Sequence, residues 1–183
     1  MPESKPSRNP KENLTLLIAM LIEKRQVNRT SLNKQLFFCD LLHFQNFKKS
    51  LSRASYRKLD FGPVPDNISE VREFMIQSDL ITENMVANGP YYEYLYEANS
   101  DKIDYKKAEK LLGEKESRLV RAVASGLSDI SASELSRITH EHEPWKSGQW
   151  FEELELESGI QDKDLMNWLN ARVKYHPHET QLN

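Results

Sequence analysis

The stretch that decides the fold reads DFGPVPD and occupies residues 60–66. Pro63 and Pro65 hold their own φ at about −65° and lack an N–H donor, and each keeps the preceding residue out of the helical region. The segment is therefore expected to be a rigid, extended corner. Residues 54–61 alternate as a half-buried strand does, and residues 66–71 favour the start of a helix. The corner is predicted to join that strand to that helix.

Two helices are predicted before the corner. The first begins at Asn9, an N-cap that Glu12 can reach back to in a capping box, and its apolar face continues to about residue 25. The second is expected to be capped by Thr30 or Ser31 and to end near residue 48. Apolar side chains surround this second helix almost completely, so it should lie at the centre of the fold.

Downstream of the corner, a third helix is predicted over residues 68–78. Two strand-like runs, 80–86 and 91–97, flank Asn-Gly-Pro and indicate a β-hairpin. Helical patterns follow at 106–125, with a break near Gly113 and an end at Gly126, then from a cap at Ser131, and again at 162–173.

These elements predict an α+β fold that is mainly helical. We expect about six helices around one small antiparallel sheet, which contains the strand before the Gly-Pro corner and the hairpin. The order helix, helix, strand, helix, hairpin resembles that of a winged-helix module. With 183 residues, the chain should form a single domain over residues 9–175, between flexible tails at 1–8 and 176–183.

Composition argues against a disulfide-rich secreted protein and against a membrane protein. The single cysteine, Cys39, excludes an internal disulfide framework and is expected to be a small buried hydrophobe. No signal peptide is recognisable, and the longest apolar run, residues 14–22, is too short to cross a bilayer. The protein is therefore expected to be cytoplasmic, with no membrane partner.

The net charge of −3 conceals an asymmetry along the chain. Residues 1–65 hold 12 Lys/Arg and 5 Asp/Glu, whereas residues 66–183 hold 13 and 23. Two halves of opposite charge can simply attract one another in the fold. The same asymmetry also suits a partner with one basic and one acidic face, or nucleic acid bound to the basic half.

The winged-helix-like order raises the hypothesis of a DNA-binding regulator. A reading helix needs positive charge to neutralise phosphates, yet the third helix carries Glu70 and Glu73. The hairpin contains only acidic charges. Three of its tyrosines, at 92, 94 and 96, share one face and suit a protein partner. DNA binding by the isolated protein is therefore expected to be weak, and a winged-helix regulator is the second hypothesis.

A metal site is suggested by HEHE at residues 140–143. On a helix, His140 and His142 point about 200° apart and cannot share a metal ion. The sequence contains no nucleophile elbow, no phosphate-binding glycine loop and no cysteine with an obvious base. We therefore assign no catalytic residue, cofactor or metal ligand, and a metal-dependent hydrolase is the third hypothesis.

Three blocks together carry a family resemblance. They read LNKQLFFCDLLH at 32–43, DFGPVPD at 60–66 and ITHEHEPWK at 138–146. Their order and separation resemble the SocA-like antitoxin family, the Panacea domain, over roughly residues 12–150. Members of that family often carry Tyr where this chain has Phe38 and Phe61, so a ring is kept and a hydroxyl lost.

The resemblance implies a function. A SocA-like antitoxin is not an enzyme: it neutralises a cognate toxin of a bacterial or prophage toxin–antitoxin system by direct contact. At least one role in the family is that of a proteolytic adaptor, which presents the bound toxin to an AAA+ protease.

The blocks that carry the resemblance also define candidate partner-binding residues. Aromatic and proline-rigid groups of this kind dominate protein interfaces, and we expect them to converge on one partly accessible surface. They are Asp40, His43, Tyr56, Lys58, Phe61, Gly62, Pro63, Val64, Pro65, His140, Glu141, Pro144, Trp145 and Lys146. Three alternatives stand beside this: Asp40 and His43 can be hydrogen-bonded core groups, Trp145 can be a core plug, and the tyrosine face of the hairpin can be the partner surface.

Overall fold

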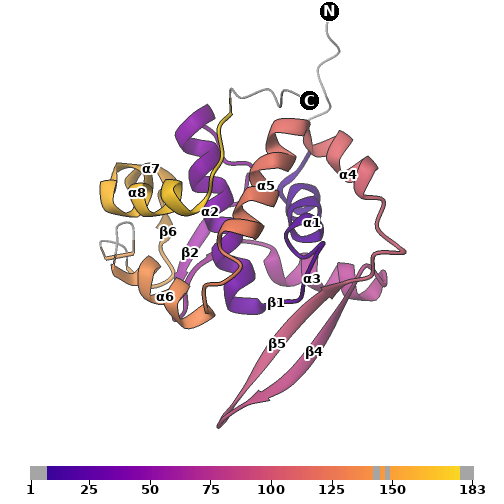
Figure 1. Ribbon diagram of the computed structural model, residues 1–183. Helices are drawn as coiled ribbons and strands as arrows, with labels where there is room; N and C mark the ends of the chain where they lie inside the picture. The colour runs from indigo at the N-terminus through magenta and orange to yellow at the C-terminus, as the bar shows by residue number, and fades with distance from the viewer. Residues whose placement is uncertain (1–7, 142–144, 147–148, 178–183) are drawn as a thin grey trace, which may run out of the picture.

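The computed structural model of the chain describes residues 8–141, 145–146 and 149–177. Within these ranges the predicted α+β class is confirmed, with eight helices and six short strands (Figure 1). The helices are α1 (Pro10–Leu21), α2 (Arg29–Phe47), α3 (Ile68–Gln77), α4 (Tyr105–Leu112), α5 (Glu114–Gly126), α6 (Ala132–Glu141), α7 (Leu156–Gln161) and α8 (Lys163–Arg172). The strands are β1 (Val27–Asn28), β2 (Tyr56–Leu59), β3 (Gly62–Pro65), β4 (Ile81–Asn88), β5 (Tyr91–Ala98) and β6 (Glu153–Leu154).

Helix α2 lies at the centre of the fold, as its apolar circumference predicts. Helices α1, α5, α6 and α7 all pack against it (Figure 1). The Phe37 ring meets the edge of the Tyr56 ring at 5.2 Å between centroids, and the Phe38 ring lies 5.7 Å from that of Trp168. Aromatic pairs at these separations stabilise a core beyond their buried area, so α2 joins the hairpin of β2 and β3 to the C-terminal helices.

Local signals in the sequence place most helix ends. Asn9 and Glu12 form the predicted capping box at the start of α1. Gly113, at φ +114°, separates α4 from α5 as predicted. The cap of α2 was predicted wrongly: the Asn28 side chain accepts a hydrogen bond from the Ser31 amide at 2.7 Å, so Asn28 is the cap, two residues before Thr30 and three before Ser31.

The prediction of one sheet is wrong, because the strands form two separate three-stranded sheets, in the orders β1-β5-β4 and β3-β2-β6. The prolines explain why. Pro63 and Pro65 lack N–H donors, so β3 can serve only as an edge strand. The other edge of β2 is taken by β6, with Arg57 opposite Glu153. No edge is left for the hairpin of β4 and β5, which pairs with β1 instead.

The proline segment is extended, as predicted, but it is not the corner. Gly62–Pro65 is itself strand β3 and pairs residue by residue with β2, from Leu59 opposite Gly62 to Tyr56 opposite Pro65. The chain reverses one step earlier, at Asp60 and Phe61. The connection is therefore a hairpin that presents Phe61 at its tip.

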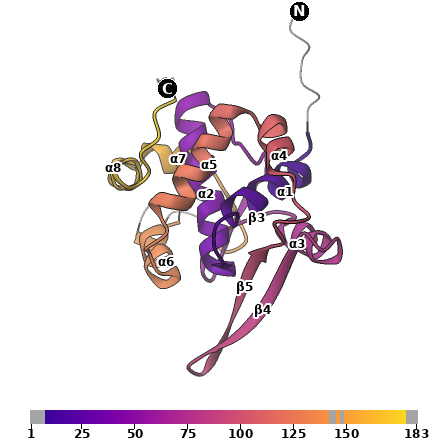
Figure 2. The same ribbon diagram turned by 45° about the vertical axis from the view of Figure 1, so that its right-hand side comes forward.

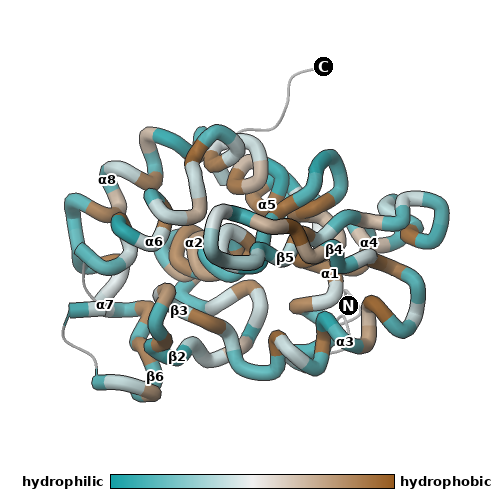
Figure 3. The backbone as a smooth tube through the Cα atoms, turned by 90° about the horizontal axis from the view of Figure 1, so that it is seen from below, coloured by the Kyte–Doolittle hydropathy of each residue, from teal (hydrophilic) through white to brown (hydrophobic). Residues whose placement is uncertain are grey.

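The two sheets lie on different sides of α2. Figure 3 shows β2, β3 and β6 on the side of α6 and α7, whereas β4 and β5 lie toward α1, α3 and α4. The β4–β5 hairpin projects from the body as an arm (Figures 1 and 2). Only Ile81 of β4 is buried, so most of the arm is open to solvent.

The predicted order helix, helix, strand, helix, hairpin is present with two unpredicted strands, β1 between the first two helices and β3 after β2, and the count of about six helices was low. The predicted break at Gly113 divides one helical pattern into α4 and α5, and α7, just before the helix predicted at 162–173, was not predicted. None of the helices in the described part of the chain is long and apolar enough to span a membrane. The predicted tails, 1–8 and 176–183, lie almost wholly outside the described residues, and the domain boundaries stay a prediction.

Candidate partner-binding site

The tip of the β2–β3 hairpin is held against the helices by one backbone carbonyl. The carbonyl oxygen of Phe61 accepts hydrogen bonds from Nζ of Lys34 on α2 and from Oγ of Ser136 on α6, the latter at 3.2 Å. Gly62, at φ +109°, makes this approach possible. A Cβ at this position would lie 2.0 Å from the Lys34 Nζ atom and 3.0 Å from Thr139 Oγ1. The tip is thus seated where only glycine fits.

Lys34 is a buried cation, since only 1% of the residue is exposed. Burial lowers the pKa of its ammonium from 10.5 to about 7. The ammonium form donates to the Phe61 carbonyl oxygen more strongly than the neutral amine does.

The titration of Lys34 predicts how stability depends on pH. Between pH 7 and about 10.5 the unfolded chain holds a proton that the folded chain has released, so the free energy of unfolding should rise with pH. This increase in the free energy of unfolding is complete above pH 10.5, the pKa of Lys34 in the unfolded chain, and it is lost as the pH falls through about 7, the pKa in the folded chain. We expect Lys34→Met to reduce the slope by up to about 1.4 kcal/mol per pH unit between pH 7.5 and 9. Urea unfolding of both proteins at several pH values measures this, and equal slopes would contradict it.

We call the contacts of the Phe61 carbonyl oxygen with Lys34 and Ser136 the seat of the hairpin tip. Trp145 lies beside this seat. The His140 ring stacks on the indole, with 4.2 Å between centroids and 15° between planes. Lys58 Nζ lies 4.8 Å from the indole centroid and donates to the Trp145 carbonyl oxygen at 2.7 Å. Burial, followed by the charges of Lys34 and Lys58, lowers the pKa of His140 and favours its neutral form. Trp145 is nearly buried and fixes the segment after α6 to β2.

Exposed aromatic rings surround the buried cluster. Phe61 has 70% of its surface exposed at the hairpin tip. Trp150 and Phe151 are also exposed, and the Phe151 amide donates to the Lys58 carbonyl oxygen at 3.1 Å. The Trp150 ring meets the Trp145 ring edge-on at 6.1 Å. We call Phe61, Trp150 and Phe151 the aromatic patch. Phe61 lies in the turn between β2 and β3, and Trp150 and Phe151 lie on the segment that leads into β6.

Asp40 lies inside the molecule. The Asp40 carboxyl accepts hydrogen bonds from the Leu51 amide at 2.5 Å, the Ser52 amide at 2.7 Å, the Ser52 hydroxyl and the Tyr56 hydroxyl at 2.7 Å. Burial raises the pKa of Asp40, and these hydrogen bonds oppose the rise. The carboxyl joins the 51–56 segment to α2 and does not reach the surface.

His43 is also buried, and its Nδ1 lies 2.6 Å from the Lys49 carbonyl oxygen. Asp40, His43 and Tyr56 therefore cannot contact a partner directly in this conformation. They support the alternative of hydrogen-bonded core groups, and they position the hairpin that carries the aromatic patch.

Some of the other predicted partner-binding residues are buried near the hairpin tip, and others are exposed at the surface. Pro63 and Pro65 are buried and Val64 is half-buried, whereas Glu141 and Lys146 are exposed. Glu141 pairs with Arg137 one turn away. Pro144 lies outside the described residues. Their role in partner binding stays a prediction.

Sequence reasoning missed Lys34, Ser136, Trp150 and Phe151 as site residues. Lys34 lies within the 32–43 block as a basic residue in an otherwise apolar helix. That contrast could have indicated that its side chain is buried and donates to a hydrogen-bond acceptor inside the protein. The two exposed rings carried no such signal, because their proximity to β2 arises from pairing across about a hundred residues.

The metal hypothesis gains no support from the described residues, which contain no group of three or more His, Cys, Asp or Glu arranged to hold a metal ion. His142 and Glu143 lie outside that part of the chain.

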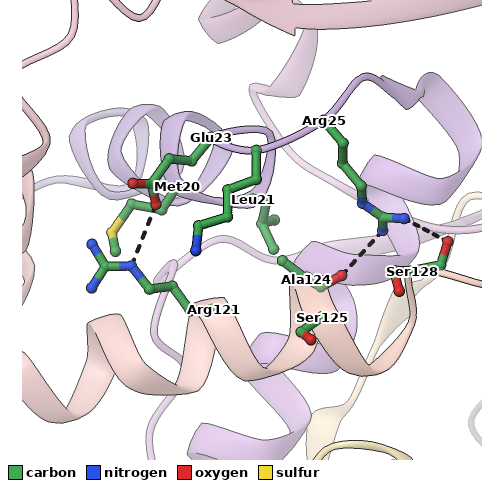
Figure 4. A pocket seen from close by; sticks show the side chains of 9 residues that line it. Met20, Leu21, Glu23, Arg25, Arg121, Ala124, Ser125 and Ser128 are labelled. Carbon is green, nitrogen blue, oxygen red and sulfur yellow. Dashed lines mark hydrogen bonds and ion pairs between the residues drawn. The ribbon is translucent and has the colours of Figure 1, made fainter.

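A separate pocket of about 240 Å³ lies between α1 and α5 (Figure 4). Arg25 donates from there to the Ser128 carbonyl oxygen at 2.5 Å and to that of Ala124 at 3.1 Å. Arg121 lies 3.4 Å from Glu23. Arg25 thus satisfies carbonyl groups at the end of α5, which is a capping role, and none of the predicted site residues lines this pocket.

Comparison with known families agrees with the three blocks. The model of the family described as antitoxin SocA-like, Panacea domain, matches residues 32–146, more than half of the chain. The chain belongs to the SocA-like antitoxin family. The matched range begins on α2, contains Lys34, Phe61 and His140, and ends just after Trp145, so the Panacea domain here includes the whole seat of the hairpin tip. Neither a curated protein nor a solved structure shows significant similarity to the chain.

Proposed function

We propose that this SocA-like protein is a non-enzymatic antitoxin that neutralises a cognate protein toxin by contact through the aromatic patch. Family membership supports a toxin partner in general terms. The observation that carries the proposal is Phe61, a large ring with 70% of its surface exposed on a backbone that Lys34 and Ser136 hold in place. Rigid, exposed aromatic rings bind partners at low entropic cost.

DNA binding is supported less well. Arg72, the basic residue in the middle of α3, lies with its guanidinium carbon 5.6 Å from the centroid of the Tyr96 ring. Its neighbours Glu70 and Glu73 are exposed and acidic. A reading helix with this charge repels phosphate, so we expect little duplex binding by the isolated protein at physiological salt.

Truncating Phe61 tests the proposal. We expect Phe61→Ala to weaken binding of the purified toxin about thirtyfold, since removing an aromatic anchor costs about 2 kcal/mol. The free energy of unfolding should change by less than about 0.5 kcal/mol, because the ring is exposed. The toxin is taken from the neighbouring open reading frame, and titration calorimetry measures its affinity.

Phe74→Ala is the matched control, because Phe74 is an aromatic residue on α3 with 54% of its surface exposed. It should leave toxin affinity unchanged. Equal affinity of Phe61→Ala and wild type would overturn the aromatic patch as the contact. A toxin level that falls only when an AAA+ protease is present would favour the adaptor role, and a constant level with lost toxicity would favour blocking.

A further inference from the structure

The arm formed by β4 and β5 carries an unused strand edge. In the described part of the chain the sheet order is β1-β5-β4, and no strand lies on the outer edge of β4. Seven of the eight residues of β4, all except Ile81, are exposed. In an antiparallel pair, half of the backbone groups of an edge strand point away from its neighbour. β4 therefore offers unpaired N–H and C=O groups along almost its whole length.

Natural proteins protect such edges, and this one is unprotected. Strand β4 reads ITENMVAN and contains no Lys, Arg or Pro, and its one charged residue, Glu83, is paired with Arg29 at the root of the arm, so little along the edge discourages another strand from pairing. Met85 and Val86 are 60% and 42% exposed at its middle. An open, partly apolar edge of this length is the structure that accepts an added strand.

The root of the arm is held in place. Glu83 pairs with Arg29 at 3.0 Å and accepts a hydrogen bond from the Tyr96 hydroxyl at 2.5 Å. The Arg29 guanidinium also lies 4.0 Å from the centroid of the Tyr94 ring. These contacts tie both strands to α2, so the edge is extended before anything binds, which lowers the entropic cost of pairing.

The negative charge of the β4–β5 arm indicates which kind of strand its free edge can bind. Residues 80–98 contain Glu83, Glu93 and Glu97 and no Lys or Arg. The register places Glu93 of β5 opposite Val86 and Glu97 of β5 opposite Thr82, so both carboxylates lie on one face of the arm, one strand in from the free edge. The other face carries Met85, opposite Tyr94, and Glu83, whose charge is already paired with Arg29. A second copy would bring like charges together, whereas a basic strand would meet opposite charge.

We propose that the outer edge of β4 binds an extended, positively charged segment of a partner protein, which adds to the sheet as a fourth strand. Its basic side chains lie on the face of Glu93 and Glu97, and its apolar side chains pack on the face of Met85. This surface is separate from the aromatic patch and is independent of the toxin contact proposed there.

A synthetic peptide tests the surface on the full chain. The probe is a capped eight-residue peptide that alternates lysine with valine and threonine, and the control peptide has glutamate in place of lysine. We expect the lysine peptide to shift the backbone amide NMR signals of residues 81–88 and to bind at least tenfold more tightly than the glutamate peptide. Equal binding of both peptides, or shifts elsewhere in the chain, overturns the proposal.

A proline on the free edge separates backbone pairing from side-chain contact. Asn88 and Tyr91 flank the two-residue turn, and Asn99 donates to the Leu80 carbonyl oxygen at 2.9 Å. By alternation the even-numbered residues of β4 bond to β5, and the Met85 N–H points outward. Met85→Pro should therefore preserve the hairpin and lower affinity for the lysine peptide at least tenfold. Met85→Thr keeps the N–H and should bind within threefold of wild type.

Three further results would overturn the proposal. Equal affinity of Met85→Pro and Met85→Thr overturns strand addition. A concentration-dependent dimer in sedimentation that Met85→Pro abolishes assigns the edge to a second copy and overturns the basic partner. Where amide dispersion shows that the proline has unfolded the arm, Glu93→Lys replaces it. That variant changes the net charge of the arm from −3 to −1 and should reduce the preference for the lysine peptide over the glutamate peptide, and an unchanged preference overturns the proposal.

Discussion

Replacing Asp40 by alanine should lower the free energy of unfolding by about 4 kcal/mol, the largest effect that we expect from a single side chain. The carboxyl is completely buried, and it is the acceptor for two backbone amides and two hydroxyls. Alanine removes every acceptor at once. The amides of Leu51 and Ser52 would then be buried without partners, and each such group costs about 1–3 kcal/mol.

The consequence extends beyond stability. Residues 51–56 connect α2 to β2, and the Tyr56 hydroxyl is one of the groups that Asp40 holds. Losing that anchor should loosen the hairpin whose tip presents Phe61. Affinity for the proposed toxin should therefore fall together with stability, although Asp40 is completely buried.

Urea denaturation followed by circular dichroism measures the change. Asp60→Ala is the matched control, because Asp60 is exposed in the turn between β2 and β3, and its free energy of unfolding should stay within about 0.5 kcal/mol of wild type. Asp40→Asn keeps one acceptor oxygen and should lose less than Asp40→Ala. A stable Asp40→Ala protein with a wild-type midpoint would show that the buried hydrogen bonds contribute nothing net.

Replacing Gly62 by valine should lower the free energy of unfolding by about 3 kcal/mol. Two causes act together. The backbone at φ +109° is strained for any residue with a Cβ, and most strained for a β-branched one. The new Cβ would also occupy the position of the Lys34 ammonium, 2.0 Å away, and displace it from the Phe61 carbonyl oxygen. Toxin binding should be lost with the seat of Phe61.

Gly89 is the comparison at which neither cause is severe. Its φ of +60° lies in the left-handed region, and no atom lies within 4 Å of a Cβ added there. Gly89→Ala should therefore cost only about 1 kcal/mol. Gly62→Ala has both the greater backbone strain and the collision, and it should cost clearly more. Thermal and urea unfolding of the three variants measure the order, and equal losses at Gly62 and Gly89 would refute both causes.

Local chemistry along the chain determined the elements and the family. The capping box of Asn9 and Glu12, the break at Gly113 and the alternation in residues 80–98 each act within a few residues, so they can be recognised before anything is folded. The apolar circumference of residues 32–44 placed α2 at the centre for the same reason. The three blocks in order were enough to indicate the SocA-like family, which the match over residues 32–146 bears out.

Only the tertiary structure decided which strands pair and which side chains meet. Pairing of β2 with β6 joins residues about a hundred positions apart, and no local pattern encodes it. The same long-range packing brings Lys34 from α2 and Ser136 from α6 to one carbonyl oxygen of Phe61. It also turned Asp40 from a candidate contact into a core group. A side chain's neighbours, and hence its burial and charge state, depend on how distant segments pack, because burial is a property of the whole fold.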